Sequence, residues 1–141
     1  MAQDKRNGRG WPEDLLGTAS RPQERTPEEI LQSEAEDLGA KTNGLLKGRV
    51  DIGAQGEYIV LDFFIVAPKL ENYEYRLLKA RHKLLPEYPV EVILSTNDKR
   101  RAKNADGLEI ILSDIFRAQS TRSIVGQLLD LTNKRGQAAS G

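Results

Sequence analysis

The 141-residue chain contains no cysteine and a single histidine, His82. The absence of cysteine excludes disulfide frameworks, thiolate nucleophiles and zinc sites built from thiolates. A lone histidine excludes a His-His metal pair and any acid-base mechanism that needs two histidines. A chain without cysteine suits a reducing compartment, so we expect a cytoplasmic location.

The sequence also lacks long apolar stretches and an excess of one sign of charge. Its longest continuous apolar run, residues 63–68, is far shorter than the roughly 20 residues that cross a bilayer. Polar residues 12–14 stand where a signal peptide would need an apolar region, so we expect no secretion signal and no membrane partner. The 21 basic and 21 acidic residues cancel, so binding to nucleic acid would have to rest on a local patch.

A dense apolar block at residues 56–94 is the most informative feature that is present. β-Branched and aromatic residues occur there in short runs separated by turn residues, a pattern that favours strands over helices. Alternation over residues 47–52 and 57–66, around a turn at 53–56, predicts a β-hairpin. Residues 73–81 and 88–94 are predicted to be further strands, although residues 74–84 also contain good helix formers.

A helix is predicted to begin at Thr26. Threonine suits the N-cap, Pro27 the first turn and Glu29 the third position of a capping box. The Asn43-Gly44 pair is expected to end this helix.

The two ends of the chain are polar. Residues 1–25 are expected to form a flexible tail in which Trp11, Leu15 and Leu16 are a small apolar cluster that could dock on the body or on a partner. Residues 135–141 are expected to be a second flexible tail. The domain between the tails is predicted to span residues 26–134.

The C-terminal part of the domain is predicted to be helical after an exposed, mobile connection at residues 96–107. Residues 108–112 fit either a short strand or the start of a helix, and the Ser113-Asp114 pair offers an N-cap for residues 115–118. An apolar stripe over residues 122–133 predicts an amphipathic helix that packs on the sheet.

These patterns predict an α+β fold with two layers. An antiparallel sheet of four to five strands is flanked by an N-terminal helix and one or two C-terminal helices. Phe63 is expected to face the core, because a one-residue slip would bury Phe64 instead. The expected core residues are Ile59 or Val60, Leu61, Phe63, Ile65, Leu77, Val92, Ile93, Ile124 and Leu128.

Candidate chemical groups are few. His82 stands between basic residues and is expected to be a solvated surface histidine. Asp51, Glu57 and Asp62 lie in the predicted hairpin, where carboxylates on neighbouring strands could share a magnesium or acid-base site. A nuclease of the carboxylate-and-lysine type would need a lysine that residues 73–76 lack. We therefore predict no catalytic, metal-binding or cofactor-binding residue, and no cofactor.

The neutral total conceals an uneven charge distribution. Residues 1–66 carry 8 basic and 12 acidic residues, and residues 67–141 carry 13 basic and 9 acidic residues. Positive charges gather at residues 76–83 and 99–103, which could form one patch if the sheet brings them together. The predicted polyanion or partner contacts are Arg76, Lys79, Arg81, Lys83, Lys99, Arg100, Arg101 and Lys103.

These observations favour a small non-enzymatic module for protein interaction or regulation, whose partner is another protein bound at the open sheet face or an edge strand. The first alternative is a nucleic-acid-associated accessory protein that uses the two basic segments. A metal-dependent hydrolase or nuclease that uses the hairpin carboxylates is the second. Residues 62–68 and 88–90 resemble small bacterial proteins in general texture, but no family of known activity, so no residue role follows.

Overall fold

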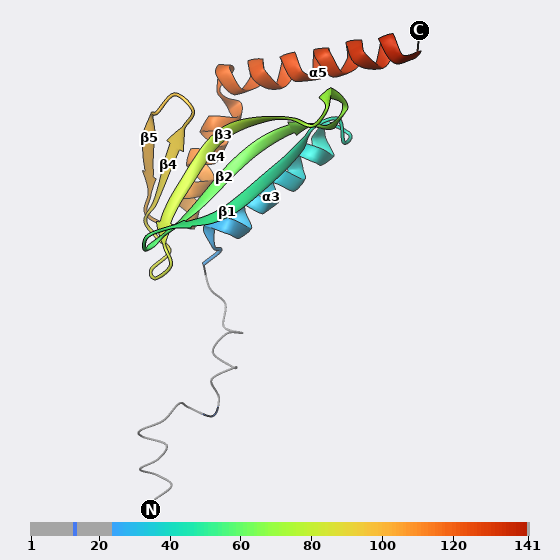
Figure 1. Cartoon of the computed structure of the whole chain (residues 1–141). Helices are drawn as coiled ribbons and strands as arrows, with labels where there is room; N and C mark the ends of the chain where they lie inside the picture. Colours follow the sequence, from blue (N-terminus) through green and yellow to red (C-terminus); the bar gives the residue numbers. More distant parts are fainter. Residues whose placement is uncertain (1–12, 14–23, 141) are drawn as a thin grey trace, which may run out of the picture.

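The computed structural model describes residue 13 and residues 24–140, with side chains through residue 135. Within these residues, a five-stranded antiparallel sheet in the order β1-β2-β3-β4-β5 is flanked by one helix before it and two after it (Figure 1). The predicted α+β fold is confirmed. The predicted cluster of Trp11, Leu15 and Leu16 lies outside the described residues.

The first hairpin is longer than the sequence predicted. β1 (Lys47–Gln55) pairs with β2 (Tyr58–Ala67), and the turn between them is Gly56-Glu57 rather than residues 53–56. Gly56 has a φ of 62°, which suits the first position of a two-residue hairpin turn. The glycine at position 53 therefore continues the strand.

β3 (Tyr73–Lys83) confirms the strand prediction for this segment over the helical alternative. It follows the short helix η1 (Pro68–Leu70) and pairs with β2 across an irregularity next to Phe63. Phe63 pairs with Leu78 whereas the next β2 residue pairs with Arg76, so Leu77 is an extra residue on β3. Both leucines are buried as a result.

The prediction of an irregular connection at residues 96–107 is wrong, although most of these residues are exposed as predicted. After β4 (Val90–Leu94), the chain forms a fifth strand, β5 (Lys99–Ala102), and then the N-cap of the next helix. β5 is mostly charged because only Ala102 faces the core. Pairing with β4, rather than apolar patterning, makes this segment a strand.

Helix α3 (Pro27–Lys41) begins as predicted. Thr26 Oγ1 accepts a hydrogen bond from the backbone N–H of Glu29 at 3.1 Å. The helix ends before Asn43 and Gly44, which both have positive φ, and the N–H of Gly44 donates to the carbonyl of Gly39 at 2.8 Å.

The two C-terminal helices resolve the ambiguous segment at residues 108–112. α4 (Ala105–Arg117) contains this segment, and its N-cap is Asn104, whose Oδ1 accepts from the N–H of Gly107 at 2.7 Å. The predicted cap at residues 113–114 is wrong, since both residues lie inside α4. α5 (Gln119–Ser140) continues beyond residue 134, where the sequence predicted a tail.

The helices cover one face of the sheet and leave the other open (Figure 1). Core residues shared by strands and helices include Leu61, Phe63, Ile65, Leu77, Val92 and Leu128, as predicted. Ile59 and Ile124 are partly buried against this core. The prediction for Ile93 is wrong, because its pairing with Lys79 and Lys99 places it on the open face. Across residues 24–140, no helix is long and apolar enough to span a membrane.

Candidate functional site

The open face of the sheet carries a regular array of charged side chains. Strand alternation places Val60, Asp62 and Phe64 on this face, opposite to the buried Leu61 and Phe63. The ladder pairings then assign the remaining charged members of the face, which are Lys47, Arg49, Asp51, Glu74, Arg76, Lys79, Arg81, Lys83, Glu91, Lys99 and Arg101.

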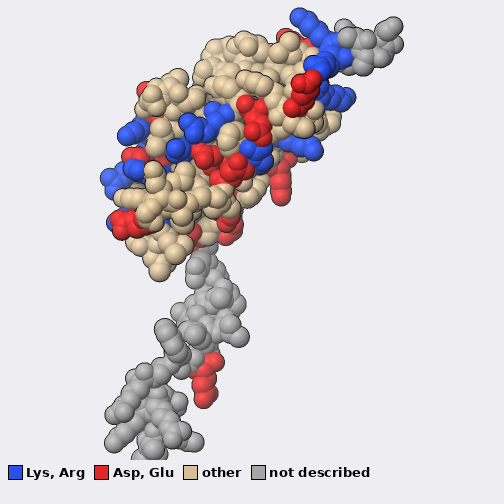
Figure 2. Space-filling view, viewed as in Figure 1, with Lys and Arg blue, Asp and Glu red and all other residues tan. Residues whose placement is uncertain are grey.

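Side chains of both charge signs are mixed on this face (Figure 2). The Arg81 guanidinium lies 3.0 Å from Glu91 and 4.8 Å from the ring centroid of Tyr58. The Arg49 guanidinium binds Asp51 at 2.9 Å, contacts Glu74 and stacks on the adjacent phenylalanine ring. Much of the positive charge is therefore neutralised within the face.

The two predicted basic segments meet across β4. Lys79, Ile93 and Lys99 form one cross-strand row, and Arg81, Glu91 and Arg101 form the next. Among the described residues, Lys79, Lys99, Arg101 and Lys103 have no carboxylate within 4.0 Å.

Not all the predicted contact residues belong to this surface. Arg100 points to the helix side, where its guanidinium lies 3.3 Å from Asp114 of α4. Lys103 lies between β5 and α4, outside the ladder. Arg76 and Lys83 lie on the open face but close to carboxylates, Asp62 at 3.7 Å and Glu57 at 3.8 Å respectively.

The hairpin carboxylates are only partly brought together. Asp51 and Asp62 are direct cross-strand neighbours, whereas Glu57 lies in the turn at the end of the hairpin. No group of three or more acidic or histidine side chains in the described part of the chain is arranged to hold a metal ion.

The prediction that His82 is a solvated surface residue is wrong. The side chain is 5% exposed, and its Nδ1 lies 2.7 Å from the backbone carbonyl of Lys83. Its basic neighbours in the sequence, Arg81 and Lys83, point to the opposite face because side chains alternate along a strand. Charged neighbours along the chain therefore gave a misleading estimate of its burial.

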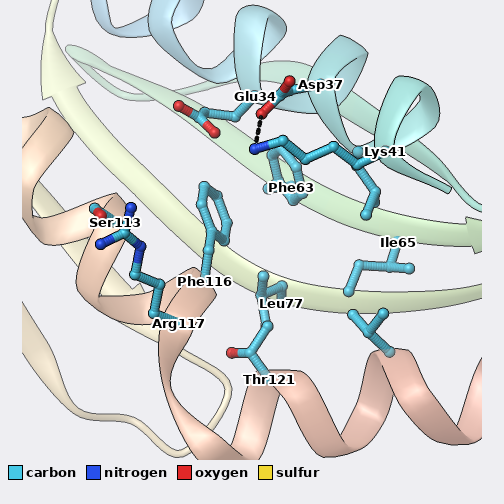
Figure 3. A pocket seen from close by; sticks show the side chains of 12 residues that line it. Glu34, Asp37, Lys41, Phe63, Ile65, Leu77, Ser113, Phe116, Arg117 and Thr121 are labelled. Atoms are coloured by element: carbon cyan, nitrogen blue, oxygen red, sulfur yellow. Dashed lines mark ion pairs between the residues drawn. The ribbon is translucent and has the colours of Figure 1, made fainter.

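The helix side of the sheet contains a groove between α3 and the α4–α5 junction (Figure 3). Its volume is about 390 Å³. Its apolar surface is formed by Leu38, Phe63, Ile65, Leu77, Phe116 and Val125, and its polar rim by Glu34, Asp37, Lys41, Ser113, Arg117 and Thr121. The Phe63 and Phe116 ring centroids are 5.6 Å apart.

The two banks of the groove differ in charge. On α3, Lys41 Nζ lies 2.9 Å from Asp37 Oδ2, as the dashed line in Figure 3 shows. Burial raises the pKa of the Glu34 carboxyl above its ordinary value, and the negative charge of Asp37 raises it further. On α4, Arg117 has no carboxylate within 4.0 Å among the described residues. The α4 bank is thus the positive one.

Glu24 and Arg25 anchor the chain at one end of this groove. Arg25 Nη1 lies 2.6 Å from Glu109 of α4, and its Nη2 donates to Ser33 of α3 at 2.9 Å. The carboxylate of Glu24 accepts from the N–H of Ala105 at 2.9 Å. The sequence assigned both residues to a tail, but Arg25 bridges α3 and α4 and Glu24 binds the start of α4.

Tyr88 strengthens this anchor. Its hydroxyl donates a hydrogen bond to the carbonyl of Arg25 at 2.8 Å. Burial and the nearby carboxylate of Glu24 raise the pKa of Tyr88 to about 12, so the hydroxyl remains a hydrogen-bond donor in alkaline solution as well as at neutral pH.

Replacing Glu34 by glutamine is expected to raise the free energy of unfolding at pH 7. A carboxyl whose pKa is raised in the folded state opposes folding once it ionises, so its cost is absent below the unfolded pKa and grows as the pH rises through the folded pKa. The gain from Glu34→Gln should therefore vanish in urea unfolding below about pH 4. A Glu36→Gln control on the exposed side of α3 removes the same charge outside the groove and should give a smaller gain in the free energy of unfolding at pH 7.

Sequence reasoning missed this groove. A signal was present on α3, because Glu34, Asp37, Leu38 and Lys41 recur at i, i+3, i+4 and i+7 and so share one helical face. The sequence interpretation explained the acidic residues by their favourable interaction with the helix dipole and did not consider that they share a face with Leu38. Which element faces this stripe follows only from the tertiary structure.

Comparison with known proteins finds no family model, no curated protein and no solved structure that matches the chain.

Proposed function

We propose that this chain is a non-enzymatic protein-interaction module whose groove between α3 and the α4–α5 junction receives an apolar segment of a partner polypeptide. The observation that carries the proposal is the composition of the groove, whose floor includes two aromatic rings and whose two rims are polar. Its volume of about 390 Å³ falls in the range of ligand sites, and an apolar groove between helices suits a short amphipathic segment.

A second hollow lies farther along α5, between this helix, η1 and the start of β3. It is lined by Leu70, Tyr73, Tyr75, Leu128 and Leu131 together with polar residues of α5. Tyr73 and Leu131 are each 51% exposed. Exposed aromatic and leucine side chains next to a groove are typical of surfaces that bind other polypeptides.

The open face gives weaker support to the nucleic-acid alternative. Lys79, Lys99 and Arg101 could contact phosphates. However, Glu91 lies between Arg81 and Arg101 in their cross-strand row and would repel a phosphate there. A patch of mixed sign is better suited to a protein with a complementary charge pattern than to a uniformly charged nucleic-acid backbone. We also propose a cytoplasmic location, since the absence of cysteine suits a reducing compartment.

The proposal is tested by selecting peptides from a random display library on the full chain. We expect the selected peptides to carry large apolar anchors at helical spacing, because the floor of the groove is apolar. Ser113→Tyr, which fills the groove from its α4 rim, should abolish binding of a selected synthetic peptide in a titration. A DNA duplex at physiological salt should show no binding to the same preparation.

The matched control is Ile110→Tyr. Ile110 lies three residues before Ser113 on α4, is 63% exposed and does not line the groove. Peptide binding should survive this change. Equal binding by both variants, or no enrichment of apolar peptides, would contradict the proposal.

A further inference from the structure

We infer that the groove binds the chain's own N-terminal segment around Trp11, Leu15 and Leu16, and that a partner must carry a similar segment to displace it. This inference rests on the proposed function, since it assigns an occupant to the same groove. It also names the class of partner segment, an aromatic anchor followed by leucines and accompanied by acidic residues.

The first support is the point at which the chain reaches the groove. Arg25 bonds to Ser33 on one bank and to Glu109 on the other, which places Arg25 near one end of the groove, and Glu24 before it bonds to the N–H of Ala105 at the start of α4. Along α4, Ser113 lies four residues beyond Glu109, which is about 6 Å at the rise of an α-helix. The groove thus begins about one helical turn from the anchor.

The second support is the length of chain before the anchor. Leu16 precedes Arg25 by nine residues, which can span about 30 Å when extended. That reach exceeds the distance to any part of the groove's α4 rim between residues 113 and 117. The connection contains Gly17 and Pro22, residue types that favour a change of direction.

The third support is chemical complementarity. Trp11 is the only tryptophan of the chain, and a tryptophan side chain buries about 150–250 Å² when it enters an apolar site. Glu13 and Asp14 stand between this anchor and the two leucines. Arg117, the cation on the α4 bank without a carboxylate within 4.0 Å in the described region, would attract them.

The test uses the fluorescence of Trp11 in the full chain. Because no other tryptophan is present, emission reports on this side chain alone. We expect an emission maximum shifted to the blue relative to N-acetyl-tryptophanamide, and protection from acrylamide quenching. Leu15→Asp combined with Leu16→Asp keeps the reporter and should shift the emission to the red and raise quenching severalfold.

Substitutions in the groove should expose Trp11 in the same way as the substitutions at Leu15 and Leu16. Ser113→Tyr and Arg117→Glu, both in α4, should each expose Trp11, whereas Ile110→Tyr at an exposed position of α4 and Arg122→Glu at an exposed position of α5 should leave it shielded. Circular dichroism of each variant checks that the fold is retained. A peptide selected on the groove should also shift the emission of the wild-type chain to the red.

Three results would overturn the inference. In the first, acrylamide quenches Trp11 of the wild-type chain as readily as the free model compound. In the second, Trp11 is shielded but does not respond to the groove variants. In the third, the shielding is lost on dilution, which would mean that the segment binds the groove of a second copy of the chain. In each case a selected peptide that binds the wild-type chain and not Ser113→Tyr would still support the groove as a docking site. Failure of this inference is thus distinguishable from failure of the proposed function.

Discussion

Truncating Phe63 to alanine is expected to lower the free energy of unfolding by about 3–5 kcal/mol. Phe63 is 2% exposed, packs against Phe116 of α4 and forms part of the groove floor. The change would leave a cavity between the sheet and the helices that the close-packed surroundings cannot fill. Chemical denaturation of the wild-type and variant chains measures the loss.

Phe64→Ala is the matched control for this change. Its ring lies on the open face, half-buried, with the Arg49 guanidinium 4.6 Å from its centroid. We expect a loss of about 1 kcal/mol, because less apolar area returns to water and a single cation-π contact is removed. A larger loss for Phe64→Ala than for Phe63→Ala would mean that the register of β2 is shifted by one residue.

Gly48→Ala is expected to destabilise the protein by about 1–3 kcal/mol or more, although it adds a single methyl group. A Cβ at this position of β1 would lie 2.4 Å from the Cα and 2.6 Å from the Cβ of Ala35. The backbone of α3 occupies the space, so a side-chain rotation cannot relieve the overlap. The strand and helix would have to separate, and the thermal midpoint should fall accordingly.

Gly53→Ala provides the comparison within the same strand. A Cβ at Gly53 would meet no atom within 4 Å. We expect stability to stay the same or to rise by about 0.4–1 kcal/mol, because alanine restricts the unfolded chain more than glycine does. Equal destabilisation by the two substitutions would show that β1 does not lie as close to α3 as the structure places it.

The contrast between Gly48 and Gly53 shows one limit of sequence reasoning. The sequence placed Gly48 inside the predicted strand at residues 47–52 and treated Gly53 as the start of a turn. The structure places both in β1 and gives only Gly48 a close neighbour. The need for glycine arises from the distance between a helix and a strand, which no local pattern encodes.

β5 shows a second limit. Its residues Lys99, Arg100 and Arg101 have the composition of an exposed loop, and the sequence predicted one. The strand exists because β4 presents an edge to pair with and because Ala102 packs in the core beside the start of α4. Secondary structure at a sheet edge therefore depends more on the neighbouring strand than on local propensity.

Local signals nevertheless determined much of this protein. Thr26 and Pro27 set the start of α3, and Asn43 and Gly44 set its end, because both signals act through the local backbone conformation. In β2 the period of a strand puts Phe64 on the same face as Asp62 and Phe63 on the opposite, buried face. Tertiary structure alone decided the burial of His82, the pairing of opposite charges across the open face and the groove between α3 and α4. Those features join residues distant in sequence, and their geometry follows from how the helices pack on the twisted sheet.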